Sequence, residues 1–238
     1  MAWYDFITNL FSKKPSKPKF RVPASNAKVC YIDRSFYQIK DSDDLEKLAS
    51  KISGCSLSGK SLDLKGAILD GKKLKGDGSQ SENQDPLLRL EMAGITIKNG
   101  FCRNVKDSIR ADAANITFQK LTFIDVGEDA ISNGKNGDNT RVIDCEFDNS
   151  KHSTADKSVQ LNNGNGALVD NCVIYGGITA IRMGDTWSSS SHKGTIKNTK
   201  FVGVDTAVNL AKIKVSMSNN TFDGVKTKVV HSHGSSVI

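Results

Sequence analysis

Six hexapeptides of one pattern decide the fold: IKNGFC (97–102), FQKLTF (118–123), VIDCEF (142–147), VDNCVI (169–174), IKNTKF (196–201) and MSNNTF (217–222). Each has an apolar first residue, an Asn, an Asp or in one case a Lys in third place, and an apolar sixth residue. The sixth residues are 21, 24, 27, 27 and 21 positions apart. A repeat of this length, built from short β-type segments, is typical of a solenoid.

A second apolar segment follows each hexapeptide and repeats with it. Its centres are 22, 28, 22, 27 and 21 residues apart, at Ile109, Ile131, Val159, Ile181, Val208 and Val229. Leucine-rich repeats have a similar period, but their LxxLxL pattern and helical segment are missing here. We therefore expect an all-β chain that forms a right-handed parallel β-helix over residues 60–238. Successive coils should stack about 4.8 Å apart.

A short helix is predicted in the segment before the repeat, residues 25–59. Its apolar residues recur at helical spacing, at Leu45, Leu48, Ala49 and Ile52. Asp41 or Ser42 can cap its start, and Gly54 can end it. We expect this helix to cover the open N-terminal end of the stacked coils, where strand edges would otherwise be exposed.

The charge of the chain is unevenly distributed. The 238 residues have a formal net charge of +7, of which residues 1–24 contribute +4. A basic surplus indicates a polyanionic partner, which can be nucleic acid, anionic lipid or acidic polysaccharide. No apolar run approaches the roughly 20 residues of a membrane span. Asp5 interrupts the apolar start, which is therefore unlike a secretion signal.

The first 24 residues are expected to form an anchoring leader, because apolar residues 3–11 are followed by the basic linker KKPSKPK. The alternative is a frayed terminus. Five cysteines form an odd number without a metal-binding spacing, which favours free, mostly buried thiols in a reducing compartment.

Equivalent residues of successive coils should form columns on the surface. Two positions before the second-segment centres stand Asp107, Asp129, Lys157, Thr179, Thr206 and Thr227. One position after them stand Arg110, Ser132, Gln160, Arg182, Asn209 and Val230. Neighbours of a buried strand residue point outward, so we expect the second column to be exposed. Acidic, then basic residues along one face indicate an acidic sugar as the substrate.

A calcium site is predicted where the acidic residues lie together. Asp107 and Asp129 should be one coil apart, with Glu128 beside them. Three carboxylates at this spacing suit a hard divalent cation such as Ca²⁺. The alternative is that these residues only form hydrogen bonds in turns. Calcium and Lys157 would acidify a uronate, and a second basic residue would remove its α-proton in a β-elimination.

Four segments resemble pectate lyase family 3, whose members are small right-handed β-helix enzymes that cleave polygalacturonate with Ca²⁺. They are GDGSQSENQDPLLRLE (76–91), ITIKNG (95–100), KDSIRADAANITFQKLTFIDVGEDA (106–130) and ADKSVQLNNG (155–164). Their order and spacing match over roughly residues 60–205. The resemblance implies Asp107, Glu128 and Asp129 as calcium ligands. It also implies Lys157 as a contact for the substrate carboxylate and Arg182 as the catalytic base.

The chain departs from this family at three places. Arg110 replaces a histidine, and Lys135 stands one residue later than the lysine of the family. The segment after Arg182 reads RMGDTW, where the family usually has a cysteine. We expect Lys135 to join Lys157 and Arg182 in catalysis. The predicted substrate-binding residues are Arg110, Gln160 and Trp187. The Trp187 indole can stack on a sugar ring, and the alternative is that it anchors its loop.

A lyase-like β-helix behind an apolar and basic leader is a common design of phage tail proteins, which is an analogy of architecture. We therefore expect a virion component made in the host cytoplasm, such as a homotrimeric tailspike. Residues 1–24 would contact other virion proteins, and no nucleic acid would be bound. The leading hypothesis is a Ca²⁺-dependent lyase of an acidic polysaccharide. The alternatives are a non-catalytic virion structural or decoration protein and, third, a translocated bacterial effector.

Overall fold

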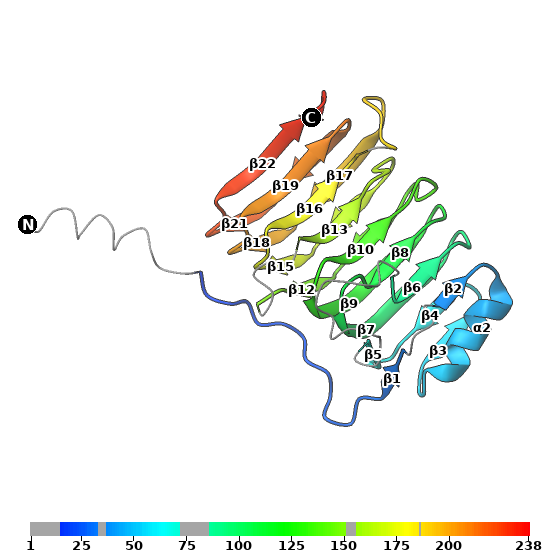
Figure 1. Cartoon of the computed structure of the whole chain (residues 1–238). Coiled ribbons are helices and arrows are strands. Elements are labelled where there is room, and N and C mark those ends of the chain that lie inside the picture. Colours follow the sequence, from blue (N-terminus) through cyan, green and yellow to red (C-terminus); the bar gives the residue numbers. More distant parts are fainter. Residues whose placement is uncertain (1–14, 33–36, 72–85, 151–155, 186) are drawn as a thin grey trace, which may run out of the picture.

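The computed structural model describes residues 15–32, 37–71, 86–150, 156–185 and 187–238. Their strands are nearly all parallel and stack coil upon coil into a β-helix (Figure 1). The predicted all-β parallel β-helix is therefore confirmed. Within these ranges, no helix has the length and hydropathy needed to cross a membrane.

The strands belong to two sheets. The 15-stranded sheet A contains β1 (Val29–Tyr31), β3 (Ser56–Ser58), β4 (Ser61–Asp63), β5 (Ile68–Asp70), β7 (Thr96–Val105), β9 (Thr117–Val126), β11 (Arg141–Ile143), β12 (Glu146–Asp148), β14 (Leu168–Asp170), β15 (Val173–Tyr175), β17 (Lys193–Lys197), β18 (Lys200–Val202), β20 (Lys214–Ser218), β21 (Thr221–Asp223) and β23 (Ser236–Val237). The eight-stranded sheet B contains β2 (Tyr37–Ile39), β6 (Leu88–Leu90), β8 (Ile109–Ala111), β10 (Asp129–Asn133), β13 (Lys157–Leu161), β16 (Thr179–Met183), β19 (Thr206–Ala211) and β22 (Thr227–Ser232).

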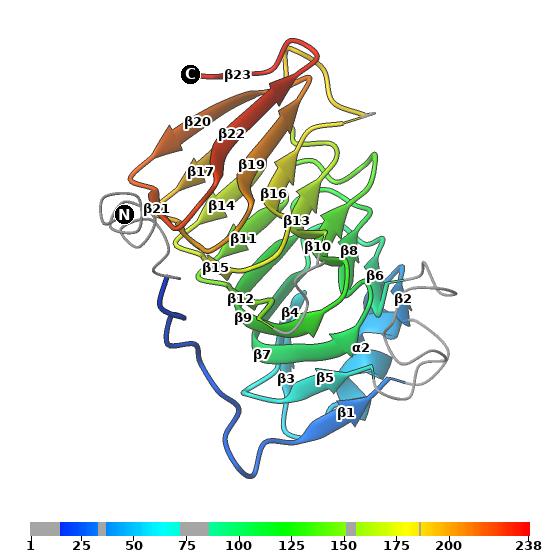
Figure 2. The ribbon, with the colours of Figure 1, turned by 60° about the vertical axis from the view of Figure 1, so that its left-hand side comes forward.

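Each coil has three sides, because sheet A bends at a corner. Row 1 of sheet A contains β4, β11, β14, β17 and β20, and row 2 contains β5, β12, β15, β18 and β21. The long strands β7 and β9 run through the corner and pair with both rows. Sheet B forms the third side (Figure 2).

The corner explains the repeated hexapeptide. The third residue of every hexapeptide has a left-handed backbone with φ between 52° and 57°: Asn99, Lys120, Asp144, Asn171, Asn198 and Asn219. Asn and Asp tolerate this conformation better than other L-residues. Their side chains also link coils, as Asn171 Nδ2 donates to Asp144 Oδ1 at 2.7 Å and Asn198 Nδ2 donates to Asp170 Oδ1 at 2.8 Å. The Asn/Asp position is therefore a requirement of the turn.

The first and sixth residues of the hexapeptides form the core. In register, the sixth residues stack as Cys102, Phe123, Phe147, Ile174, Phe201 and Phe222. Phe123 and Phe147 stack with ring centroids 5.1 Å apart, and Phe201 and Phe222 with centroids 5.2 Å apart. None of the five cysteines forms a disulfide, and all but Cys55 are buried, in line with the predicted mostly buried thiols.

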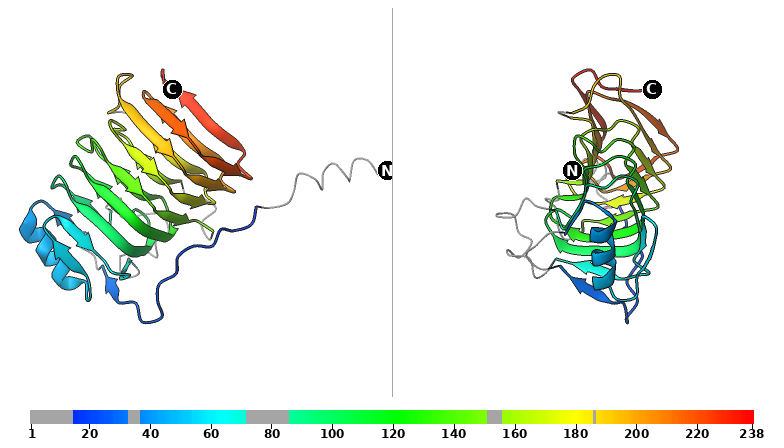
Figure 3. Two further views of the ribbon diagram at one scale, coloured as in Figure 1. Left: turned by 180° about the vertical axis from the view of Figure 1, so that it is seen from behind. Right: turned by 90° about the vertical axis from the view of Figure 1, so that its right-hand side faces the viewer.

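Helix α2 (Ser42–Lys51) lies at the N-terminal end of the stack, opposite the C-terminal coils (Figure 3). Asp41 caps it by accepting a hydrogen bond from the backbone N–H of Asp44 at 3.0 Å. Leu45 and Leu48 are buried against the first strands. The predicted helix and its cap are therefore confirmed.

Residues 15–24 pass over row 2 and are bound to it by the basic residues of the predicted leader. Arg21 Nε lies 3.1 Å from Glu146 Oε2, and its Nη2 donates to the carbonyl oxygens of Leu121 and Asp144. Lys17 Nζ lies 2.6 Å from Asp148 Oδ2. Part of the leader charge therefore serves an intramolecular contact. Residues 1–14 lie outside the described residues.

Candidate functional site

Sheet B and the turns at its two edges hold the predicted site residues. The column of Arg110, Gln160 and Arg182 is half-buried, whereas Asp129 and Lys157 are each only 9% exposed. Asp129 pairs in register with Lys157, and Gln160 lies between Ser132 and Arg182. All strands of this sheet run in one direction, so their starts form one edge and their ends the other. A five-residue strand separates the two edges by roughly 13 Å. The predicted residues accordingly fall into an acidic edge, a middle and a basic edge.

The acidic edge brings together four of the predicted residues. The backbone N–H of Asp129 donates to Asp107 Oδ1 at 3.2 Å. Lys157 Nζ lies 3.7 Å from Asp129 Oδ1 and also pairs with Asp156. Glu128 is engaged differently, because its Oε2 lies 2.9 Å from Lys106 Nζ. Sequence reasoning did not identify Lys106 and Asp156, whose only signal was their position beside predicted residues.

Burial makes the two aspartates of this edge difficult to ionise. Desolvation raises the pKa of Asp129 to about 7; Lys157 opposes the shift, while Asp107 and Glu128 add to it. Desolvation also raises the pKa of Asp107. A perturbed carboxyl pair beside a lysine is common at functional sites.

Calcium fits the chemistry of this edge, because all predicted donors are carboxylate oxygens. Asp129 Oδ1 is also buried without a hydrogen-bond partner among the described residues. However, the described parts of the chain contain no cluster of three His, Cys, Asp or Glu side chains close enough to hold a metal ion. Calcium binding would require Glu128 to exchange Lys106 for the ion. The calcium site therefore remains a prediction.

The middle of the face presents Gln160 and Arg182 side by side. Gln160 Oε1 and Arg182 Nε are buried, and neither has a hydrogen-bond partner within the described ranges. Such unsatisfied groups are rare in proteins and indicate a place where a ligand can bind. Arg182 Nη2 lies 3.0 Å from Asp185 Oδ2, so this guanidinium already pairs with one carboxylate. A direct role of Arg182 in proton transfer would require it to leave this partner.

The basic edge brings together three more predicted residues, which line one pocket of about 390 Å³. Lys135 lies here, away from Lys157, together with Arg110 and Trp187. The pocket is also lined by Arg89, Glu91, Asp112 and Asn136, which sequence reasoning missed. The register of Arg89 with Arg110 shows that it continues the predicted outward column by one coil.

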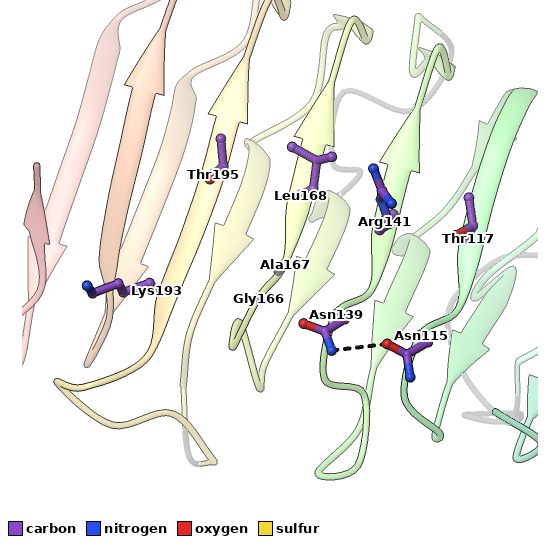
Figure 4. A pocket seen from close by; sticks show the side chains of 9 residues that line it. All are labelled: Asn115, Thr117, Asn139, Arg141, Gly166, Ala167, Leu168, Lys193 and Thr195. Atoms are coloured by element: carbon purple, nitrogen blue, oxygen red, sulfur yellow. Dashed lines mark hydrogen bonds between the residues drawn. The ribbon is translucent and has the colours of Figure 1, made fainter. Parts of the chain in front are cut away.

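A larger pocket of about 670 Å³ lies on the outer face of row 1 (Figure 4). The side chains of Thr117, Arg141, Leu168 and Thr195 follow one another there across four strands. Asn139 Nδ2 donates to Asn115 Oδ1 at 3.0 Å, again from one coil to the next. None of the described residues that line this pocket is acidic, a histidine or a cysteine, so those residues offer little for catalysis. The sheet B face is the better candidate in spite of its smaller pocket.

A family model described as rhamnogalacturonase A/epimerase, pectate lyase-like matches residues 57–229. The chain belongs to this family. The matched residues run from β3 into β22 and include all of the site residues named above. Family membership and fold together identify a pectate lyase-like β-helix. The finer resemblance to pectate lyase family 3 stays a prediction.

Proposed function

We propose that this protein cleaves an acidic, uronate-containing polysaccharide by Ca²⁺-dependent β-elimination on the outer face of sheet B. The observation that carries the proposal is the order of unrepeated charged residues on this face. Carboxylates stand at Asp107 and Asp129, followed by Lys157 and Arg182 on the next coils. Membership in a pectate lyase-like family supports a role on polysaccharides.

The residues of this face would have separate roles in the reaction. Asp107, Glu128 and Asp129 would hold calcium, which when bound neutralises the uronate carboxylate and makes the neighbouring C–H more acidic. Lys157 would orient the same carboxylate. Arg182, once it has lost its own proton, would accept the α-proton of the sugar. The C4–O bond to the leaving sugar would break as the C4=C5 double bond forms, and the leaving oxygen would take a proton from water. For Arg182 to act as the base itself, it would first have to leave Asp185.

The competing proposal is a non-catalytic protein that keeps the fold and binds a glycan or other virion proteins. Two observations favour it: the ion pair of Arg182 with Asp185, and the engagement of Glu128 by Lys106. Both leave the catalytic groups occupied in the structure.

For the biological setting we propose a phage virion, with the chain as a tail or tailspike component and a homotrimer as its assembly. The support is the analogy of a β-helix behind an apolar and basic leader. Because residues 15–24 are bound to row 2, docking to other virion proteins would fall to residues 1–14. Deleting residues 2–14 should abolish incorporation into particles without lowering the melting temperature. Unchanged incorporation would contradict this role.

The experiment for the proposed activity measures two products from a panel of acidic polysaccharides. Ultraviolet absorbance detects unsaturated uronates, which only β-elimination produces, and a reducing-end assay detects any cleavage. We expect both signals to rise together with calcium and to vanish with chelator. Arg182→Ala should abolish them. Lys197→Ala is the matched control, because Lys197 is also paired with an aspartate, Asp170, but lies on row 1.

Three outcomes separate the proposals. Reducing ends without ultraviolet absorbance would contradict elimination and indicate hydrolysis. Binding without any product on the whole panel would favour the non-catalytic protein. Full activity in Arg182→Ala would show that the reaction takes place elsewhere.

A further inference from the structure

Two arginines on neighbouring coils share one carboxylate at the basic edge of sheet B. Arg110 Nε lies 2.9 Å from Asp112 Oδ1, and Arg89 Nε lies 2.6 Å from Asp112 Oδ2. The Asp112 side chain is only 11% exposed, while both arginine side chains are more than one third exposed. The buried carboxylate therefore fixes both guanidinium groups and leaves part of each accessible to solvent.

The Nη groups of both arginines remain available for a ligand. An arginine has five N–H donors, and the contacts with Asp112 and Glu91 use only Nε. No hydrogen bond joins these Nη groups to another residue in the described part of the chain. The planar fork of two Nη groups matches a carboxylate in shape and charge.

Glycine at position 134 makes room for this arrangement. A Cβ atom added there would collide with Asp112 Oδ1 and would lie 3.0 Å from Arg110 Nη2. Any other residue would therefore displace the carboxylate that holds the arginines. Gly134 follows the end of β10 on the next coil. The side chains of Asp112 and Arg110 therefore reach across to that coil.

The rest of the pocket suits a charged sugar. Its lining has three cationic side chains, Arg89, Arg110 and Lys135, but only two anionic ones, Glu91 and Asp112. Trp187 is 39% exposed and lines the same pocket with an aromatic side chain. Aromatic rings with an exposed face are common in sites that bind amphipathic ligands.

We propose that Arg89 and Arg110 form a clamp for the carboxylate of a uronate residue, in a subsite separate from the acidic edge. Asp112 is the positioning residue that orients both guanidinium groups, and Trp187 packs against the sugar ring. The proposal rests on the proposed substrate class, an acidic polysaccharide. It adds a recognition site for a sugar that lies beside the one being cleaved.

A purely structural reading is available for the same contacts. Gln38 Nε2 donates to Glu91 Oε1 at 2.6 Å, so polar pairs link three successive coils here and could serve only to hold the stack together. The two readings differ in their consequences. A structural ladder changes stability alone, whereas a clamp changes the ability to distinguish a uronate from its neutral counterpart.

The test is calorimetric titration of the full chain, in chelator, with trigalacturonate and other uronate trimers, each beside its carboxyl-reduced counterpart. Chelator removes any contribution of calcium. We expect at least one uronate trimer to bind about ten- to a hundredfold more tightly than its neutral counterpart. Arg89→Gln, Arg110→Gln and Asp112→Asn should each remove most of this preference. The matched control is Arg103→Gln, because Arg103 Nε pairs with Asp70 at 2.7 Å on row 2 with similar exposure.

The results separate this proposal from the proposed function. Uronate preference that persists in Arg110→Gln, or no binding of any uronate trimer, would overturn the clamp. Lost preference in Arg103→Gln to the same degree would also overturn it, because the effect would then be one of general stability. A clamp that binds uronates in a protein without lyase activity would disprove only the proposed reaction.

Discussion

The corner between rows 1 and 2 and the outer face of sheet B are built from the same coils, but they use their residues differently. At the corner, Asn or Asp recurs in all hexapeptides but one, the left-handed backbone recurs in every one, and side-chain hydrogen bonds between coils recur with the Asn residues. On sheet B, the residue type at the equivalent position changes along the stack, from Asp129 to Lys157 and then to threonine at Thr179 and the coils after it.

This difference distinguishes residues that maintain the fold from residues that bind a ligand. A residue that recurs in every coil meets a demand of the backbone, which is the same in every coil. A residue that differs from its equivalents on the neighbouring coils is not needed by the fold. Unrepeated charged residues gathered on one face therefore point to a ligand. Variants of the repeated residues should therefore mainly lower stability, and variants of the sheet B face should mainly weaken binding.

The largest effect is expected in the repeated core. Phe147→Ala removes a fully buried ring that stacks on Phe123, and should lower the free energy of unfolding by about 3–5 kcal/mol. Chemical denaturation measures this change. Trp187→Ala, in the pocket of sheet B, should change stability by only about 0.5 kcal/mol or less. Equal losses in the two variants would contradict the distinction.

The next effect concerns Asp129 and has a defined pH window. In chelator the folded state keeps a proton on Asp129 up to pH about 7, whereas the unfolded chain releases it near the ordinary aspartate pKa of 3.8. The folded state therefore binds more protons in this window, and stability should fall as pH rises from about 4 to 7, by a few kcal/mol. Asp129→Asn should remove this slope while abolishing activity. An unchanged slope would show that another group is responsible.

A smaller effect is expected at the corner. Asn171→Ala places a less suitable residue in the left-handed region and removes the hydrogen bond to Asp144, so it should cost about 1–2 kcal/mol. Asn171→Gly is the informative control. Glycine adopts this backbone freely and loses only the hydrogen bond, so its cost should be the smaller one. The reverse order would mean that backbone conformation does not explain the repeat.

The smallest effect should be a gain. Lys120 is the one lysine at the repeated corner position, and its φ is 52°. Lys120→Asn restores the residue type of the repeat and should raise the free energy of unfolding by about 0.5–1 kcal/mol. Lys200→Asn, at an exposed strand position, is the control and should give no gain. Thermal melting of both variants measures the difference.

Much of the fold could be predicted because the coils repeat. The spacing of Ile109, Ile131 and Val159 gave the register that the structure shows, and with it the columns of Asp129 and Arg182. Helix α2 and its cap were also predictable, because capping depends on local residues.

Arg89 was missed although Leu88 lies 21 residues before Ile109, at the period of the repeat, so extending the predicted column by one coil would have found it. The rest depends on features without a period. The passage of residues 15–24 over row 2 depends on Arg21 meeting Glu146, far away in sequence. The partners of the site residues, such as Asp185 for Arg182, depend on side-chain positions that a pattern of residue types does not specify.

The central claim is that the unrepeated residues of sheet B bind an acidic glycan, while the repeated residues only maintain the fold. Its most direct test is titration of oligogalacturonate, or of whichever uronate oligomer binds the wild type most tightly, against Arg182→Ala and Asn198→Ala. We predict that Arg182→Ala weakens binding about tenfold or more without loss of stability. Asn198→Ala should lower stability and leave the affinity unchanged. Wild-type affinity in Arg182→Ala, or lost affinity in the folded Asn198→Ala protein, would contradict the account.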